Sequence, residues 1–555
     1  MEYLIYRNNP LNQFVQIRLH ILCKQGEEIF LQLPSWRPGR YEITNYAQKI
    51  RSFSVSKDSE NIPWKKKTKD LWLFTAETLG TYTIDYEFHA SQMDAGGSWS
   101  DDEQLYLNFI NCCFELKGRE DEAITLQLIL PDDYKAVTAL PCTSKNHFRA
   151  NNFQHLVDSP LMASNSIKHY GYQIGGSYFH LWFQGEIHFD IYGLIEKFKL
   201  FTEKQIQAFG EFPAEDYHFL YQLLPYKHYH GVEHQFSTVI TIGPADTLGQ
   251  KENLDELFGV SSHELYHVWN VCRIRPKELQ PYDFSKEAYI DTGVVAEGVT
   301  TYMGDIFLLK SGYFRLEEYL SNMEKQIERE FESFGWQNQS ISESSWDLWL
   351  DGYKTGIPEK KVSIYNRGAL ISLCLDLMLI DQGSSLHEVM KTMWERFGIN
   401  EKGYSLSHYK QAIIDHHNDR SEIIEFFDQY IQGRKDIFPL LKKLLASINI
   451  RIESAPHPGL LDTNWGIKTA PDGTILKIHP QCPSYKLLMQ GDKISEIDKN
   501  SFGNIKQLGN RALSVKLNRF GRILHLHIPS SEQSYYQKFN LLSGENNSKR
   551  NKWMS

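Results

Sequence analysis

The chain has 555 residues, more than one hydrophobic core usually supports, so its length predicts roughly two to four domains. Its composition is that of a globular protein, with 41% apolar and 23% charged residues, which excludes a disordered or fibrous chain. The formal net charge of -10, without a long basic run, argues against a nucleic-acid partner because phosphate binding needs a clustered basic surface.

The cysteines and the apolar segments indicate the compartment of the protein. The 7 cysteines are few, odd in number and scattered, which is typical of reduced thiols and unlike a disulfide framework. Residues 1–23 lack the basic start and uninterrupted apolar run of a signal peptide. The longest apolar stretch, 369–380, is shorter than the roughly 20 residues that span a bilayer, and it contains Asp376. We therefore expect a cytoplasmic protein with no membrane partner.

Residues 1–175 show the alternation of apolar and polar side chains that is typical of strands. The pattern recurs in short segments separated by turn residues, such as FVQIRLHILC at 14–23 and TYTIDYEFHA at 81–90. Such alternation is typical of antiparallel strands that bury one face. We therefore expect an N-terminal antiparallel β-sandwich domain over residues 1–175, within a multidomain α+β protein.

The central part of the chain has a different periodicity. Beyond about residue 205 the apolar spacing is helical, as in DELFGVSSHELYHVWNV at 255–271 and YNRGALISLCLDLMLIDQ at 365–382. This spacing continues to about residue 447. Residues 176–453 are therefore predicted to form a mainly helical central domain.

Proline and glycine mark the start of a third part of the chain. The segment SAPHPG at 454–459 carries two prolines and a glycine, which indicates a linker. Residues 460–530 follow with strand patterns, a short helix and a Gly-Asp turn, so we expect a small β-rich module over 454–530. The remainder, 531–555, is mostly polar and ends in SGENNSKRNKWMS, which predicts a frayed tail.

The segment SSHELYHVWN at 261–270 carries the strongest chemical signal. His263 and His267 lie four positions apart, so one helix face presents both imidazoles, where they can bind one ion. Neutral imidazole suits Zn²⁺, which in catalytic sites takes three protein ligands and leaves one position for water. Glu264 is placed to act as general base on that water, whose pKa the metal lowers to about 7. A helix whose histidines only pack or hydrogen-bond is the alternative interpretation.

Glu297 is the predicted third ligand. It lies thirty positions after His267 in VVAEGVTTYMGD, an apolar helical pattern that predicts burial, and a buried carboxylate without a partner is costly. We therefore expect one Zn²⁺ per chain, held by His263, His267 and Glu297. The alternative is a buried ion pair from Glu297 to Arg273 or Arg275. A further polar group should orient the histidines, and the sequence offers three candidates: Asp291, Thr301 and Asp305.

These segments resemble a known family. HELYHVWNVCRIRP at 263–276 and AEGVTTYMGD at 296–305 are similar to the glycyl aminopeptidase family of gluzincin zinc metallopeptidases. Further segments that resemble this family are LPSWRPGRYEITNYAQKI at 33–50, HGVEHQFS at 230–237 and SIYNRG at 363–368. Near the C-terminus, MQGDKISEID resembles the Gly-Asp turn of PDZ-like domains. The resemblance implies an N-terminal β-domain, a thermolysin-like catalytic domain and a PDZ-like C-terminal domain.

The resemblance also implies roles outside the metal motif. Tyr365 lies in a segment similar to the Tyr-x-Lys-Gly of related gluzincin aminopeptidases, so we expect its hydroxyl to donate to the oxyanion. Glu233 is the expected partner of the free ammonium of the substrate, and Gly231 lets the peptide backbone approach closely. The alternative for Tyr365 is an ordinary half-buried aromatic at a helix start. The alternative for Glu233 is a surface or strand-edge glutamate.

The predicted function is that of a zinc-dependent aminopeptidase acting on peptides, with the preference for small N-terminal residues such as glycine or alanine that the resemblance implies. Two other classes stay open: a zinc endopeptidase on the same scaffold, and a non-catalytic peptide-binding protein that works through the terminal module. The chain departs from the family at three positions that we expect to affect substrate fit more than zinc chemistry: His230, Ile364 and Arg367.

Overall fold

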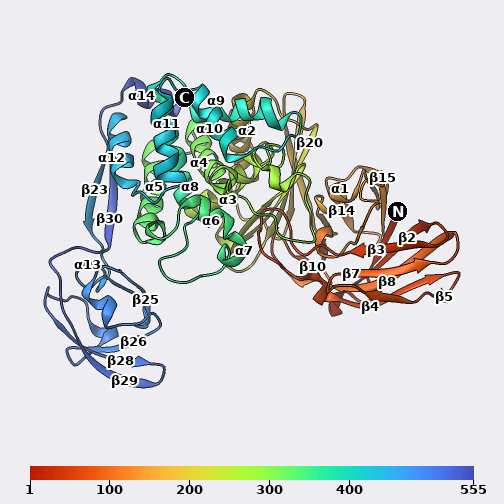
Figure 1. The fold of residues 1–555 in the computed structure, drawn as a ribbon, viewed down its shortest axis with the longest axis horizontal. Coiled ribbons are helices and arrows are strands. Elements are labelled where there is room, and N and C mark those ends of the chain that lie inside the picture. Colours follow the sequence, from red (N-terminus) through yellow and green to blue (C-terminus); the bar gives the residue numbers. More distant parts are fainter.

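The computed structural model describes residues 1–555 and consists of three parts (Figure 1). A β-rich domain lies at one end of the molecule, a mainly helical domain lies in the middle, and a small β-rich module hangs below the helices at the other end. This arrangement confirms a multidomain α+β fold with an N-terminal β-rich domain and a helical domain.

Three sheets form the N-terminal domain and share one apolar core. In β8 (Gly80–His89) every second residue from Tyr82 to Phe88 is buried, which is the predicted period of two. The largest sheet has the order β15-β16-β13-β1-β2-β8-β4-β5, and all of its pairings are antiparallel except that of β1 with β13. Its other strands are β1 (Glu2–Tyr6), β2 (Phe14–Cys23), β4 (Ile50–Lys57), β5 (Glu60–Asn61), β13 (Ile124–Leu128), β15 (Cys142–Ser144) and β16 (His147–Ala150).

The two smaller sheets of this domain have the orders β12-β3-β7-β6 and β14-β17-β11-β10-β9. Their strands are β3 (Glu27–Gln32), β6 (Trp64–Lys66), β7 (Leu71–Ala76), β9 (Ser91–Gln92), β10 (Ser98–Ser100), β11 (Gln104–Leu107), β12 (Glu115–Leu116), β14 (Lys135–Val137) and β17 (Leu161–Ser164). A short helix, α1 (Phe153–Val157), precedes β17.

The central domain begins with a five-stranded mixed sheet of the order β18-β19-β20-β22-β21. Three of its strands fall beyond residue 205, where the sequence predicts helices, so that prediction is wrong for this stretch. All residues of β22 are buried, and such a strand lacks the alternation that distinguishes it from a buried helix. The strands are β18 (Lys168–Ile174), β19 (Ser177–Gln184), β20 (Asp216–Leu223), β21 (His228–Glu233) and β22 (Ser237–Gly243).

Helices enclose the largest apolar core of the protein together with this sheet. The helices are α2 (Ile191–Phe209), α3 (Lys251–Tyr266), α4 (Thr300–Lys310), α5 (Leu316–Phe331), α6 (Ile341–Trp346), α7 (Leu348–Asp351), α8 (Asn366–Asp381), α9 (Leu386–Met393), α10 (Leu406–Asp415), α11 (Arg420–Phe426) and α12 (Phe438–Ser447). A π-helical turn at Val294–Val299 leads into α4 and packs closely on α8. Glycine is required at this contact, because a Cβ on Gly298 would lie 2.5 Å from the Cα of Gly368.

The apolar stretch at 369–380 is the buried centre of α8. None of the helices combines the length and the apolar composition that a membrane-spanning helix needs. By length and composition alone one pair of helical segments would qualify, Asn366–Asp381 with Leu386–Gly398, and these two are bent by 102° to each other.

Two paired strands connect the C-terminal module to the helical domain. β23 (Ile450–Pro456) and β30 (Gln537–Ser543) are antiparallel, run side by side in Figure 1, and leave residues 457–536 inserted between them. The linker predicted at 454–459 therefore begins inside a strand. The elements of the inserted module are α13 (Asp462–Trp465), β24 (Ile467–Thr469), β25 (Ile475–Ile478), β26 (Lys493–Ile497), β27 (Asn500–Ser501), β28 (Leu513–Arg519) and β29 (Arg522–Ile528). A PDZ-like identity for this module stays a prediction.

The last residues of the chain differ from the frayed tail that the sequence predicts. β30 returns to the helical domain, where the backbone N–H of Leu541 donates to Glu324 of α5 at 2.6 Å. The chain then ends in α14 (Ser548–Met554). Trp553 is 0% exposed, and its indole N–H donates to the hydroxyl of Tyr302 at 2.9 Å. The mostly polar composition of this segment does not indicate the docking. A single buried aromatic side chain, Trp553, is enough to anchor the short helix to a core that other segments form.

Candidate metal site and catalytic cleft

The two histidines of the HELYH segment lie at the C-terminal end of α3. Helical spacing places them on one face, and the Nε2 atoms of His263 and His267 are 3.0 Å apart. After His267 the chain makes a tight turn. Arg273 donates to the carbonyl of Val268 at 2.8 Å, and Arg275 donates to that of Cys272 at 2.7 Å. The Arg-Ile-Arg segment therefore stabilises the turn that ends the helix.

The π-helical turn at Val294–Val299 brings a carboxylate to the histidine pair. The Oε2 atom of Glu297 lies 3.6 Å from Nε2 of His263 and 3.4 Å from Nε2 of His267. The three donor atoms lie within 4.8 Å of one another, so they can hold one metal ion. π-helical turns are rare and occur frequently at functional sites, because the wider turn changes the direction of a side chain.

The charges around these residues fit a divalent cation. Glu297 is 3% exposed, and its Oε2 atom has no hydrogen-bond partner in the protein. Arg273 and Arg275 donate to backbone carbonyls and to Gln280, so neither forms the buried ion pair that is the alternative for Glu297. Two further buried carboxylates, Glu233 and Glu264, also lack a lysine or arginine partner. Burial of this much negative charge is costly unless a cation compensates for it.

The pKa values of His267 and Glu297 also fit a cation at this site. Burial lowers the pKa of His267, but the nearby carboxylates, above all Glu297, outweigh it and raise the pKa to about 10. Burial raises the pKa of Glu297, but the two histidines outweigh this effect and hold that pKa at about 2. The site therefore favours a positive charge at the point where these side chains meet.

A second group of potential ligands shares one of the same histidines. Glu233, Glu264 and His267 also lie within 4.8 Å of one another. This group offers one imidazole and two carboxylates, whereas the group with Glu297 offers two imidazoles and one carboxylate. Catalytic zinc sites commonly use two histidines and one glutamate, so the group with Glu297 fits zinc better.

A backbone carbonyl orients His267, and the sequence did not identify it. The Nδ1 atom of His267 lies 3.1 Å from the carbonyl oxygen of Asn270, and a carbonyl only accepts, so Nδ1 carries the proton. The side chain of Asn270 in turn donates to the carbonyl of Val295 at 2.8 Å and to the hydroxyl of Thr300 at 2.9 Å. Asn270 thus ties the turn after α3 to the segment that carries Glu297. Of the three candidates named from the sequence, Asp305 accepts from Gln326 and Thr301 has no partner for its hydroxyl.

Glu264 lies between the histidine pair and β21. It is buried, its Oε2 atom has no hydrogen-bond partner, and burial raises its pKa well above the usual range. Gly231 of β21 faces it so closely that a Cβ there would lie 2.2 Å from Oε1 of Glu264. Glycine at 231 therefore leaves the room that this carboxylate occupies.

Glu233 ends β21 two residues later and lines the same cleft. It is buried, its Oε1 atom has no partner, and burial raises its pKa. The N-terminal domain contributes the opposite wall, because a Cβ on Gly39 would lie 2.4 Å from Oε2 of Glu233. Gly39 has a φ of +73°, a conformation that side chains rarely adopt.

Tyr365 precedes the first residue of α8 and lines the cleft. Burial and the charge of Glu297 raise the pKa of its phenol well above the usual range, so the hydroxyl stays protonated and can donate a hydrogen bond. A second tyrosine, Tyr353, lines the cleft beside it and donates to the carbonyl of Gly39 at 3.3 Å. The sequence offers no pattern that would identify Tyr353, because it lies in an irregular loop.

The cleft that contains these groups has a volume of about 630 Å³, and most of the residues that line it are polar. Of the three departures from the family, only His230 lines it. Ile364 belongs to the apolar core, and Arg367 is 2% exposed and pairs with Glu330. The prediction that Ile364 and Arg367 affect substrate fit is therefore wrong for direct contacts, since neither lines the cleft. Cleft residues that the sequence did not identify include Gln326 and Arg329 of α5.

Two domain families match the sequence. Residues 2–165 match the M61 peptidase N-terminal domain, and residues 256–371 match the M61 glycyl aminopeptidase domain. Together the two matches span half of the chain and include all three potential zinc ligands. No curated protein sequence matches the chain significantly.

Solved structures share the fold. An aminopeptidase N family protein from Idiomarina loihiensis aligns over 100% of both chains with a TM-score of 0.87 and 24% sequence identity. An M1 zinc metallopeptidase from Deinococcus radiodurans aligns over 78% of this chain and 94% of its own, with a TM-score of 0.50 and 13% identity. At these identities the likeness concerns the fold, while the two matching domains identify the family.

Proposed function

Because the chain belongs to the M61 glycyl aminopeptidase family and is a zinc metallopeptidase, we propose that it removes small residues such as glycine or alanine from the N-termini of peptides. One observation carries the exopeptidase proposal: Glu233 presents a buried carboxylate without a partner in the cleft that contains the histidine pair. The preference for small residues rests on the family resemblance.

His263, His267 and Glu297 are the proposed ligands of one Zn²⁺ per chain. The support is their donor chemistry, their mutual distances and the three buried carboxylates that gather here without a lysine or arginine partner. The proton on Nδ1 of His267, held by the carbonyl of Asn270, leaves Nε2 free to act as a ligand. Zinc bound there would polarise the scissile carbonyl and make water more acidic.

Glu264 is the proposed general base. A carboxylate beside the ligands can accept the proton of the attacking water and later deliver it to the leaving amine. Burial raises the pKa of Glu264, which helps the side chain to hold that proton between the two steps. Gly231 leaves the space that this carboxylate occupies, since a Cβ there would lie 2.2 Å from Oε1 of Glu264. A close approach of the substrate backbone to β21 at this glycine stays a prediction from the sequence.

Tyr365 is the proposed donor to the oxyanion. As the scissile carbonyl becomes tetrahedral its oxygen gains negative charge, and a fixed donor stabilises that charge more than it stabilises the substrate. The raised pKa keeps the Tyr365 hydroxyl protonated throughout the accessible pH range.

Glu233 is the proposed anchor for the substrate α-ammonium. A buried carboxylate lacking a partner gains most from such a cation, because the pair forms away from water. An anchored ammonium places the first peptide bond, and no later one, at the reacting groups. This arrangement predicts an exopeptidase.

Location and the terminal module are further parts of the proposal. All 7 cysteines are free, which supports a reducing compartment such as the cytoplasm. For the module, a PDZ-like domain is proposed from the resemblance of MQGDKISEID to the Gly-Asp turn of such domains; in the structure Asp492 is buried in this turn and accepts from the backbone of Met489 at 2.9 Å.

The test is the hydrolysis of an alanine-led tripeptide, free and N-acetylated, with and without a chelator. The free peptide should be cleaved about tenfold or more faster, since a charged hydrogen bond contributes roughly 1.5–3 kcal/mol. Glu233→Ala should remove most of this difference, whereas Glu252→Ala, at the exposed start of α3, should leave it intact. Equal cleavage of both peptides would contradict the aminopeptidase proposal and favour an endopeptidase. Binding of peptides without any cleavage would favour a non-catalytic protein.

A further inference from the structure

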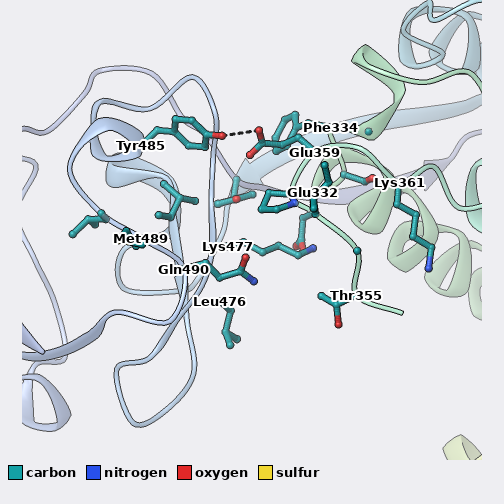
Figure 2. Close-up of a pocket in the computed structure, with 18 of the residues that line it drawn as sticks. Glu332, Phe334, Thr355, Glu359, Lys361, Leu476, Lys477, Tyr485, Met489 and Gln490 are labelled. Atoms are coloured by element: carbon teal, nitrogen blue, oxygen red, sulfur yellow. Dashed lines mark hydrogen bonds and ion pairs between the residues drawn. The ribbon is translucent and has the colours of Figure 1, made fainter. Parts of the chain in front are cut away.

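A second cavity lies where the helical domain meets the C-terminal module (Figure 2). Its volume is about 680 Å³, and it is open to solvent. The helical domain contributes Glu332–Gly335, just past α5, and the loop Thr355–Lys361. The module contributes β25 residues Leu476–Ile478 and the segment Tyr485–Gln490. In Figure 2 the labelled side chains of the module and those of the helical domain lie on facing sides of this space.

The module is held at this position by polar contacts across the cavity. Lys468 and Lys477 both pair with Glu332, the latter at 3.4 Å. The hydroxyl of Tyr485 donates to Glu359 at 2.7 Å, which Figure 2 shows as a dashed line. These contacts tie two sides of the module to the helical domain, so the cavity has two walls in a defined arrangement.

A smaller polar hollow, here called the trench, lies between this cavity and the catalytic cleft and shares lining residues with both. The trench has a volume of about 280 Å³ and shares four lining residues with the cleft: Thr301, Gln326, Arg329 and Tyr365. It shares two others, Ser333 and Ser363, with the cavity at the module. The three hollows therefore follow one another along the C-terminal half of α5 and the segment before α8.

The length of the trench corresponds to a few residues of extended peptide. Gln326 lines the cleft and Ser333 lines the cavity, seven positions further along α5 and its end. Seven helical residues advance by about 10 Å. An extended peptide covers that distance with about three residues at roughly 3.3 Å each. A substrate cleaved after its first residue has its first two residues at the reacting groups, and about three more residues would span the trench. Its fifth or sixth residue would thus reach the cavity.

The side chains along this path suit a peptide. In the trench, the guanidinium of Arg329 takes part in none of the ion pairs or hydrogen bonds of the protein, so it is free to bind main-chain carbonyls. The cavity offers apolar side chains that water now covers, since Leu476 and Met489 are each 47% exposed. Its charged side chains balance, two glutamates against two lysines, so an apolar ligand group is favoured over a charged one.

We propose that this cavity is a distal binding site of the same enzyme for the downstream part of its substrate. The ligand would be an extended peptide of about six residues or more, with an apolar side chain at its fifth or sixth position in the cavity. The proposal rests on the aminopeptidase function proposed above. It gives the C-terminal module a role in selecting longer peptides, because the module supplies one wall of the cavity.

Three C-terminally amidated peptides test this inference: an alanine-led tripeptide, a heptapeptide with leucine at positions five and six, and the same heptapeptide with serine there. Amidation removes the free carboxylate, which would otherwise let Arg329 favour the tripeptide. Wild-type enzyme should cleave the leucine heptapeptide with a kcat/KM about tenfold or more above that of the other two, as burial of apolar side chains implies.

The protein variants locate the effect. Leu476→Ser with Met489→Ser should reduce the ratio of kcat/KM for the leucine heptapeptide to that for the tripeptide. Ile523→Ser, 54% exposed on the same module but outside the cavity, should leave this ratio as in wild type. Equal kcat/KM for all three peptides, or a leucine preference that survives the double substitution, would overturn the distal site. Failure to cleave even the tripeptide would instead overturn the aminopeptidase activity on which the site depends.

Discussion

Gly231→Ala is a small substitution with a large expected consequence. Gly231 lies in β21 directly opposite Glu264, the proposed general base. Its backbone conformation is open to other residues, so alanine introduces no backbone strain. The added Cβ would, however, lie 2.2 Å from Oε1 of Glu264 and 2.7 Å from a methyl carbon of Val260 on the same helix.

Such contacts cannot persist, so Glu264 or α3 has to move. Contacts below 3.0 Å are essentially never observed, which requires a displacement of about 1 Å at the carboxylate. A misplacement of this size costs on the order of a hundredfold in rate. The contact with Val260 adds overpacking, for which we expect a loss of about 1–3 kcal/mol in the free energy of unfolding.

The assay combines turnover of an alanine-led tripeptide with metal analysis and thermal unfolding. We expect a hundredfold lower kcat in a folded variant that still contains zinc, on the order of the general-base contribution. Gly259→Ala is the matched control, because Gly259 lines the same cleft on α3 and its added Cβ would meet no atom within 4 Å. Turnover of folded Gly231→Ala equal to that of wild type would refute the assignment of this contact.

Three further predictions concern the metal and the reacting groups. Glu264→Gln should keep the fold and the zinc but lower turnover by at least about a hundredfold, and near-normal turnover of the zinc-loaded variant would exclude Glu264 as base. His263→Ala should lose stoichiometric zinc in metal analysis, because two ligands remain; full retention of zinc would contradict this ligand set. Tyr365→Phe should lower kcat by on the order of a hundredfold with a smaller change in KM. If KM alone changed, Tyr365 would contact substrate without stabilising the oxyanion.

The parts of the fold that follow a local period could be predicted from the sequence. β8 buries every second residue, and α8 buries a continuous apolar run, so both patterns are readable without knowledge of their neighbours. β22 and the C-terminal half of β20 could not be recognised in this way, because they lie inside a mixed sheet and are buried on both faces. The docking of α14 depends on a pocket for Trp553 that distant segments build.

The position of the histidine pair, with Glu264 beside it, could be predicted from the sequence alone, because residues four positions apart lie on the same face of a helix. Glu297 could be predicted as the third ligand because its apolar surroundings in the sequence predict a buried carboxylate that needs a partner. The tertiary structure alone decided which atom orients His267, how closely Gly231 approaches Glu264, and where the cleft continues. These features depend on backbone carbonyls, on missing Cβ atoms and on segments that lie far apart in the chain, and none of them leaves a periodic trace in the sequence.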